Sequence, residues 1–250
     1  MVDSSFPRYA YDDDLIAAAR RDEWTRVRVY RLTDTVVVLG SGSRPEVELN
    51  LDACQADDVP ILKRRGGGCA VVLDPGNVIV SVVATGLPFG RHRQHFDTLT
   101  AWLIDGLARI GIPGIDRAGI CDLVLGDRKV GGACLHRCRD LLYYSASLLI
   151  DPDVDKVTRY LKHPPREPEY RRGRSHAAFM GSLATPVVDT RRRRIAAATG
   201  VDRPAGATDG AGALQVAARL RRALHEVDPV SGGLAAMAHR GRVGGISALV

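Results

Sequence analysis

Two glycine-bearing segments decide how this chain is interpreted: Lys63-Arg64-Arg65-Gly66-Gly67-Gly68-Cys69-Ala70-Val71-Val72-Leu73-Asp74-Pro75-Gly76-Asn77 and Gly126-Asp127-Arg128-Lys129-Val130-Gly131-Gly132-Ala133. A basic pair that leads into a glycine run lets backbone N–H groups approach an anion or a carbonyl closely, because glycine has no side chain in the way and tolerates positive φ. The second segment contributes Lys129, whose compact ammonium group can be directed at a reacting centre with small residues behind it. Together the segments indicate a ligand that carries phosphate.

The residues around the first segment favour β-structure. Residues 27–39 form two β-rich runs, and the second, Val36–Leu39, is apolar throughout, as a buried strand would be. Residues 47–58 are mixed and acidic, which predicts a loop and a short helix. The turn sequence Asp74-Pro75-Gly76-Asn77 precedes a further strand over residues 78–84. We therefore expect the first glycine segment to lie between elements of a sheet.

Helices and further strands alternate through the middle of the chain. Apolar residues recur at three- and four-residue steps over residues 96–110, which predicts an amphipathic helix. Residues 122–125 and 141–150 have the character of strands that flank the second glycine segment, and a helix capped by Asp151 is expected to follow. Because the order lacks a strict βαβ rhythm, the sequence predicts an α+β fold with mixed, largely antiparallel sheets and packed helices.

The length and composition predict one main core with a distinct C-terminal part. The chain has 250 residues, of which 45% are hydrophobic, and this suits one generous domain. We expect a main domain over residues 1–198 and a Gly- and Ala-rich extension over residues 199–250. Within the extension, residues 199–212 are typical of a linker and residues 213–227 predict one helix.

The chain carries a formal net charge of +6, which favours anionic partners such as nucleotides, nucleic acid or an acidic protein. Much of the excess lies late in the sequence, for example in residues 171–174 and 191–194. Aromatic residues make up 5% of the chain, so platforms on which bases could stack are scarce. We therefore do not expect a dedicated nucleic-acid-binding protein, and interpret the arginines as solvated or as a contact patch for an acidic protein.

The sequence lacks the patterns of a membrane-spanning or secreted protein. No stretch approaches the roughly 18 to 20 apolar residues that a membrane helix needs, and the acidic N-terminal residues do not form a basic-then-apolar leader. The five cysteines are odd in number and scattered, which argues for reduced thiols. Cys134, His136 and Cys138 are not followed by a second ligand pair, so no metal site is predicted. These features predict a cytoplasmic protein.

The two glycine-bearing segments resemble those of the lipoate–protein ligases and octanoyl transferases, which share their catalytic domain with the biotin–protein ligases. The family pattern Arg-Arg-x-Ser-Gly-Gly-Gly-Ala-Val-x-His-Asp-x-Gly-Asn is matched by Lys63-Arg64, Gly67-Gly68, Ala70-Val71 and Asp74-x-Gly76-Asn77. The pattern Gly-Arg-Lys-Val/Ile-Ser/Ala-Gly-Ser-Ala is matched by Asp127-Arg128-Lys129-Val130-x-Gly132. Their order and separation agree, and supporting similarity covers about residues 25–185.

The resemblance implies a lipoate ligase-like catalytic domain over residues 1–198. It implies that ATP with Mg²⁺ activates lipoate or a related fatty acid as acyl-AMP, and that the acyl group passes to a lysine of an acceptor lipoyl-domain protein. In the family the lysine of the second segment contacts both the acyl carbonyl and the phosphate, so Lys129 is implied as the catalytic residue. The residues implied to bind nucleotide and acyl group are Arg64, Gly67, Gly68, Cys69, Ala70, Val71, Val72, Asn77, Asp122, Lys129 and Gly132.

The sequence departs from the family pattern at Gly66, Cys69 and Leu73, where the family has serine, glycine and histidine. Two alternatives stay open. One is ATP-independent octanoyl or lipoyl transfer through a cysteine thioester, for which Cys69 or Cys134 would have to replace the Pro-Cys-Gly nucleophile that this chain lacks. The other is a non-catalytic binder of lipoyl or biotinyl groups or of their carrier domain.

A Pro- and Arg-rich stretch, residues 166–176, follows the predicted helix after Asp151 and is expected at the surface. It either helps to hold the anionic adenylate or the acidic acceptor domain, or is an ordinary solvated loop.

Overall fold

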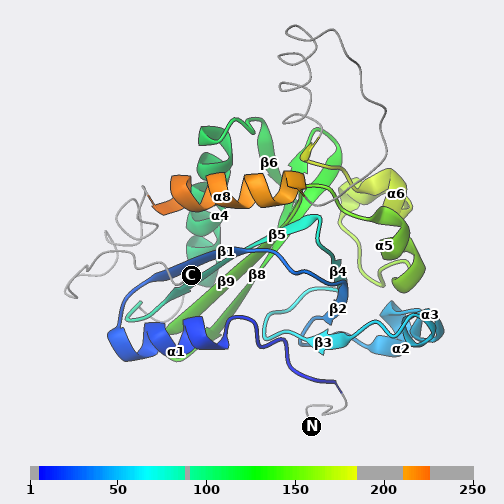
Figure 1. Cartoon of the computed structure of the whole chain (residues 1–250), viewed down its shortest axis with the longest axis horizontal. Helices are drawn as coiled ribbons and strands as arrows, with labels where there is room; N and C mark the ends of the chain where they lie inside the picture. The colour runs from blue at the N-terminus through cyan, green and yellow to red at the C-terminus, as the bar shows by residue number, and fades with distance from the viewer. Residues whose placement is uncertain (1–5, 88–90, 185–210, 226–250) are drawn as a thin grey trace, which may run out of the picture.

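A six-stranded sheet forms the centre of the computed structural model, which describes residues 6–87, 91–184 and 211–225 (Figure 1). Its strands follow the order β1-β5-β9-β8-β7-β6, and every neighbouring pair is antiparallel. The strands are β1 (Arg26–Tyr30), β5 (Asn77–Ala84), β6 (Ile115–Ala118), β7 (Asp122–Leu125), β8 (Arg128–Cys138) and β9 (Leu141–Leu149). The prediction of an α+β fold with largely antiparallel sheets is confirmed.

Two helices cover one face of this sheet (Figure 1). They are α4 (His92–Arg109) and α8 (Ala211–His225). Successive side chains on a strand point to opposite faces, so Val78, Val80 and Val82 of β5 share the face that these helices cover. These valines are fully buried with Leu103 of α4 and Leu220 of α8, and the burial of such apolar surface is the main driving force for folding.

A smaller sheet carries the first glycine segment. Its central strand β2 pairs in parallel with β3 and antiparallel with β4. The strands are β2 (Val36–Leu39), β3 (Ile61–Lys63) and β4 (Val71–Leu73). Residues 64–70, which we call the glycine loop, connect β3 to β4. The expectation that the glycine segment lies between elements of a sheet is confirmed.

The remaining helices surround the two sheets (Figure 1). Helix α1 packs against Val83 and Tyr143, which point to the face of the large sheet opposite α4 and α8. These helices are α1 (Asp13–Asp22), α2 (Pro45–Glu48), α3 (Leu51–Ala56), α5 (Val154–Tyr160), the 3₁₀ helix η1 (Glu169–Arg171) and α6 (His176–Phe179). Among the described residues, no helix combines the length and apolar character that crossing a membrane requires.

The structure corrects several predicted boundaries. The predicted strands that flank the lysine segment are confirmed as β7 and β9, and Lys129 itself lies in the long strand β8, which pairs with both of them. Helix α5 is capped by Asp153, whose side chain accepts a hydrogen bond from the Lys156 N–H, and not by Asp151. Asp151 instead donates its N–H to the carbonyl of Gly76 at 2.9 Å, because it pairs with the turn before β5. Helix α4 begins at His92, and not at residue 96 as predicted. The apolar periodicity does not reveal this start, because the first turn of the helix is polar.

Part of the C-terminal extension belongs to the main core. Helix α8 overlaps the predicted helix over residues 213–227 and contacts α4, β1 and β5. The predicted boundary at residue 198, residues 199–210 of the predicted linker and residues 226–250 lie outside the described residues.

Candidate functional site

A cavity of about 1120 Å³ lies between the glycine loop and the six-stranded sheet. Cys134, Ser145 and Ser147, which share the sheet face opposite α4 and α8, form part of its lining. We call it the main cavity. All of the predicted ligand-binding residues except Asn77 line it: Arg64, Gly67, Gly68, Cys69, Ala70, Val71, Val72, Asp122, Lys129 and Gly132.

Lys129 and Asp122 form an ion pair in this cavity. The Lys129 Nζ lies 2.7 Å from the Asp122 Oδ1, and the two side chains are 28% and 9% exposed. The strand pairing is irregular between Leu123 and Val124, so Asp122 on β7 lies opposite Gly132 and not opposite Gly131. The lysine therefore reaches back over Gly132, where a Cβ atom would lie 3.4 Å from both its Cε and its Nζ. The ammonium group thus lies over the Gly132 backbone, beside the carboxylate.

The glycine loop is held in a fixed shape by Arg64. The guanidinium donates hydrogen bonds to the backbone carbonyls of Val38 at 3.1 Å, Gly67 at 2.7 Å and Cys69 at 2.9 Å. Gly68 has a φ of 93°, a conformation that favours glycine. Arg64 was expected to contact a ligand, but in the structure it lines the main cavity while its donors hold the loop backbone.

Glu48 of α2 supports the loop from the other side, and the sequence analysis did not identify it. Its buried carboxylate accepts hydrogen bonds from the Ala70 N–H at 2.6 Å, the Ser43 hydroxyl at 3.0 Å and the Arg44 N–H at 3.2 Å. What distinguishes Glu48 is that an acidic side chain is buried at the end of the short helix α2. This burial can be recognised only in the three-dimensional structure. Glu48 and Arg64 together fix the backbone that lines the cavity.

Asn77 lies at the start of β5, is 1% exposed and does not line the main cavity. Neither atom of its amide has a hydrogen-bond partner among the described residues. The neighbouring Asp74 accepts hydrogen bonds from the Gly76 N–H at 2.6 Å and the Asp153 N–H at 2.9 Å. The Asp74 carboxylate thus joins the turn to the start of α5, which is a structural role.

The cysteines of the cavity are packed thiols. Burial raises the pKa of Cys69, of Cys121 and of Cys134. A Cβ atom on Gly66 would lie 2.6 Å from the Cys134 Sγ, so a glycine at position 66 accommodates this thiol. The departure from the family pattern at Gly66 therefore coincides with a packing contact to Cys134.

Residues 166–176 line the main cavity at several positions, which favours the first of the two interpretations of this stretch. The Tyr170 hydroxyl donates a hydrogen bond to the Asp122 Oδ2 at 2.8 Å. Sequence reasoning singled out Tyr170 within this stretch but did not predict its contact with Asp122, because the contact joins residues far apart in the chain.

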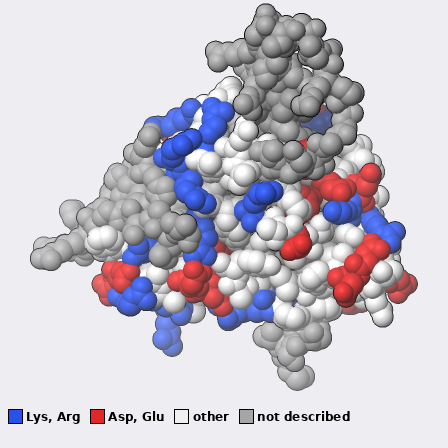
Figure 2. Space-filling model, viewed as in Figure 1, with Lys and Arg blue, Asp and Glu red and all other residues white. Residues whose placement is uncertain are grey.

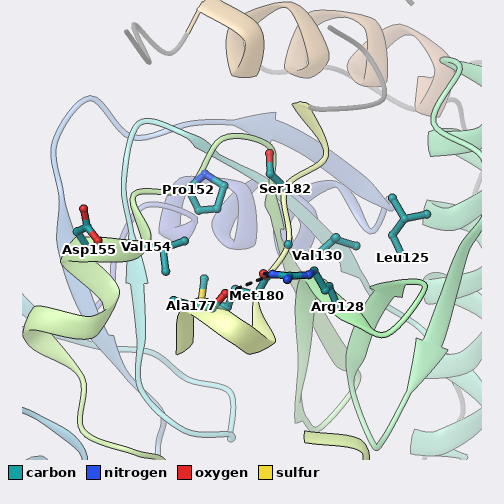
Figure 3. Close-up of a pocket in the computed structure, with 10 residues that line it drawn as sticks. Leu125, Arg128, Val130, Pro152, Val154, Asp155, Ala177, Met180 and Ser182 are labelled. Atoms are coloured by element: carbon teal, nitrogen blue, oxygen red, sulfur yellow. Dashed lines mark hydrogen bonds between the residues drawn. The ribbon is translucent and has the colours of Figure 1, made fainter. Parts of the chain in front are cut away.

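A second, smaller cavity of about 490 Å³ lies between β8, α5 and α6 (Figure 3). Arg128 donates hydrogen bonds to the carbonyl groups of Met180 at 3.1 Å and Ala177 at 3.3 Å, as Figure 3 shows for Met180. Arg128 thereby holds α6 against the strand that carries Lys129. None of the predicted site residues lines this cavity.

Basic side chains gather over α8 and the neighbouring end of α4 on the face shown in Figure 2. The exposed arginines of α8 are Arg219, Arg221 and Arg222. They lie across the large sheet from the main cavity, so part of the positive charge is remote from the candidate site.

The family model that describes the lipoyl protein ligase A/B catalytic domain matches residues 5–196 of this chain. The lipoate-protein ligase A of Psychrobacter cryohalolentis is 30% identical over 139 residues, which covers 55% of this chain and 38% of that protein. The lipoate–protein ligase of Streptococcus pyogenes is 28% identical over 151 residues, covering 60% and 43%. This chain spans less than half the length of these curated relatives.

Solved structures share the fold. A structure from the analysis of a bi-partite lipoate protein ligase and its E2 lipoyl domain from Thermoplasma acidophilum has a TM-score of 0.59 and 20% sequence identity, with 94% of this chain and 92% of that chain covered. A lipoate-protein ligase A bound with ATP gives a TM-score of 0.56 at 20% identity, with coverage of 90% and 92%.

Proposed function

The chain belongs to the lipoyl protein ligase A/B catalytic domain family, and we propose that it activates lipoate or a related fatty acid with ATP and transfers the acyl group to a lysine of an acceptor lipoyl-domain protein. The relatives named as lipoate–protein ligases support the ligase class, and the ATP-bound structure of the same fold supports ATP as substrate.

The observation that carries this proposal is the Lys129–Asp122 pair in the main cavity, beside the glycine loop. A fixed cation in a cavity that is large enough for a nucleotide and an acyl chain fits a reaction in which negative charge develops on neighbouring oxygens. Asp122 holds the ammonium group in place through the ion pair at 2.7 Å, above the Gly132 backbone.

The proposed reaction has two steps. First, a carboxylate oxygen of the fatty acid attacks the α-phosphorus of ATP, an O–P bond forms, the bond from that phosphorus to the bridging oxygen breaks, and pyrophosphate leaves. Second, the neutral amine of the acceptor lysine attacks the acyl carbon, a C–N bond forms, the C–O bond to AMP breaks, and the nitrogen loses a proton. Both steps place charge on carbonyl or phosphate oxygens, which one positioned cation stabilises. We assign this role to Lys129.

The glycine loop is assigned to the nucleotide and acyl group. Gly67, Gly68 and Cys69 line the main cavity, and hydrogen bonds from Arg64 to the Gly67 and Cys69 carbonyls and from the Ala70 N–H to Glu48 hold this backbone. A backbone that is already ordered loses little conformational entropy on binding, so it supports tight and specific contacts.

We propose that Mg²⁺ enters with ATP. The described residues contain no cluster of three side chains that could ligate a metal ion, and Mg²⁺ is commonly held by substrate phosphates, water and one or two carboxylates. The phosphate oxygens would therefore supply most of its ligands. We place the reaction in the cytoplasm, where ATP is available and the five free cysteines stay reduced.

Thioester-based transfer is the weaker alternative. A cysteine nucleophile reacts as its thiolate, and burial raises the pKa of both Cys69 and Cys134, so both thiols are protonated near neutral pH. The Cys69 Sγ also contacts the carbonyl of Arg166 at 3.8 Å as a donor, which uses the thiol in its protonated form.

The test is incubation with ATP, Mg²⁺, lipoate, octanoate or biotin and an apo lipoyl domain, followed by intact-mass measurement of both proteins. We expect acyl-AMP formation and an acylated acceptor, and loss of both in Lys129→Ala with an unchanged melting temperature. Lys156→Ala is the matched control, because Lys156 contacts Thr35 and Asp153 outside the main cavity.

The other possible outcomes of these experiments distinguish the proposal from its alternatives. Near-normal adenylation by Lys129→Ala would contradict the proposal. An octanoyl adduct on the protein after incubation with octanoyl carrier protein, without ATP, would show the transferase. Binding of lipoate and ATP in calorimetry without any turnover would indicate a non-catalytic binder.

A further inference from the structure

The Asp122 carboxylate is held from two sides by side chains that come from different parts of the chain. Its Oδ1 lies 2.7 Å from the Lys129 Nζ, and its Oδ2 accepts the Tyr170 hydroxyl at 2.8 Å. A carboxylate with one oxygen in each contact cannot rotate without breaking one of them. The Asp122 side chain is 9% exposed, so water competes little for either oxygen.

Tyr170 is itself anchored. It lies in η1, and its ring packs on the Phe179 ring with 5.1 Å between the ring centroids. Arg171 and Arg174 place their guanidinium groups over the same Phe179 ring, at 4.7 Å and 5.4 Å from its centroid. Such cation–π contacts and the ring packing hold the segment against α6.

A second anchor ties this segment to the turn that leads into β8. Arg174 donates hydrogen bonds to the Asp127 carboxylate and to the Asp127 backbone carbonyl, both at 2.9 Å. It also donates to the Tyr170 carbonyl at 2.9 Å. Tyr170 therefore has a fixed position relative to the strand that carries Lys129.

The Tyr170 hydroxyl acts as a donor at any working pH. Burial raises the pKa of the phenol, and the adjacent Asp122 carboxylate raises it further. A neutral phenol that donates to a carboxylate forms a charge-assisted hydrogen bond, which is stronger than one between neutral groups.

We propose that Tyr170 is a positioning residue for the ligase reaction: by holding the Asp122 carboxylate, it holds the Lys129 ammonium group at the place where the acyl carbonyl and the α-phosphate meet. This inference rests on the proposed function. Tyr170 does not contact the reacting atoms itself; it acts through Asp122. Without it, the carboxylate is free to turn, and the partly exposed lysine side chain samples other rotamers.

Tyr170→Phe is the decisive variant, because it retains the ring on Phe179 and removes only the hydroxyl. We expect kcat for acyl-AMP formation to fall by about tenfold to a hundredfold, the range for a lost hydrogen bond to a charged group, while KM for ATP changes little. Tyr11→Phe is the matched control, since Tyr11 is exposed and does not line the main cavity.

A double-mutant cycle separates positioning from a general structural role. If Tyr170 acts through Asp122, adding Tyr170→Phe to Asp122→Ala causes no further loss of kcat. Multiplying losses in the double variant would overturn the proposal, and so would an unchanged kcat in Tyr170→Phe. A raised KM together with a lower melting temperature and an unchanged kcat would likewise overturn it.

The reactivity of Lys129 provides a readout that does not need turnover. An amine-reactive label, quantified on the Lys129 peptide by mass spectrometry, should modify Lys129 faster in Tyr170→Phe than in the wild type or Tyr11→Phe. Faster labelling in a protein that forms no acyl-AMP would leave the positioning role standing and refute the proposed function. Equal labelling of all three proteins would overturn the positioning role.

Discussion

Lys129 depends on the residues around it as much as on its own charge. It reaches Asp122 over Gly132, because the irregular pairing between Leu123 and Val124 sets Asp122 opposite that glycine. Gly66 makes room for the Cys134 thiol, because a Cβ atom at position 66 would lie 2.6 Å from the Cys134 Sγ. At position 66, where the family has serine, the missing side chain is matched by the Cys134 thiol from the other segment, so this departure is best explained by packing within the site.

A single residue, His95 of α4, is expected to make the stability of the protein depend on pH. His95 is fully buried, and neither ring nitrogen has a hydrogen-bond partner among the described residues. Burial lowers its pKa below 6.5, and the nearby charges of Arg137, His92 and Arg91 act in the same direction. The unfolded chain takes up this proton at about pH 6.5, so the stability that His95 contributes is complete above that pH and is lost as the pH falls towards the lowered pKa.

We therefore expect the free energy of unfolding, measured in urea, to fall between about pH 7.5 and pH 5.5. In His95→Leu this fall should be smaller, because the group that must remain neutral is gone. A residual slope is expected, since burial also lowers the pKa of His136 and of His176. The exposed His163→Gln is the control, and an equally steep fall in His95→Leu and wild type would contradict the explanation.

At the scale of elements, the glycine loop is held by partners that no local pattern predicts. The loop lies between β3 and β4, while Glu48 reaches it from α2 and Arg64 folds back onto its own loop. Gly40, at the end of β2, lies so close that a Cβ atom there would be 1.9 Å from the Gly68 carbonyl oxygen. The shape of the binding surface is thus a property of two strands and a short helix together.

Glu48→Ala tests this arrangement. It leaves the Ala70 N–H and the Arg44 N–H without this acceptor, and the Ser43 hydroxyl keeps only the Gly68 carbonyl, at 3.3 Å, as an acceptor, so we expect the free energy of unfolding to fall by about 1–3 kcal/mol. Because the loop backbone is then less ordered, KM for ATP should rise. Urea unfolding and ATP titration measure the two effects. Exposed Glu46→Ala, in the same helix, should change neither; equal effects of both variants would refute the role of Glu48.

The sequence predicts features that depend on neighbouring residues, and it misses features that depend on contacts between residues far apart in the chain. The strand Val36–Leu39 and the glycine segment between sheet elements are set by local composition, and the predicted site residues gather because both segments meet one cavity. Tyr170 and Glu48 depend on contacts between residues far apart in the chain, which periodicity does not report. The Asp153 cap was missed because Asp151 and Asp153 are equivalent as sequence signals, and the contact between Asp151 and the turn at Gly76 decides between them.

At the scale of the whole molecule, helix α8 completes the core that supports the site. Leu220 and Leu224 are buried with residues of β1, β5 and α4, and a Cβ atom on Gly106 of α4 would lie 2.3 Å from the Leu224 Cδ2. The Arg221 guanidinium donates to the Val29 carbonyl at 2.7 Å. Residues that composition assigned to an extension therefore share the apolar face of the sheet whose opposite face carries the main cavity.

Leu220→Ala measures whether α8 unfolds with the catalytic core. Leu220 is fully buried, so its truncation should leave a cavity and lower the free energy of unfolding by about 2–5 kcal/mol in a single urea transition. Leu214 lies on the same helix but is 55% exposed, so Leu214→Ala should change stability far less. If α8 were an independent unit, Leu220→Ala would leave the main transition, followed by the near-UV signal of Trp102, at its wild-type urea concentration. Because Trp102 lies on α4 within the same core, a shift of that signal in Leu220→Ala and not in Leu214→Ala is the result expected of one cooperative domain.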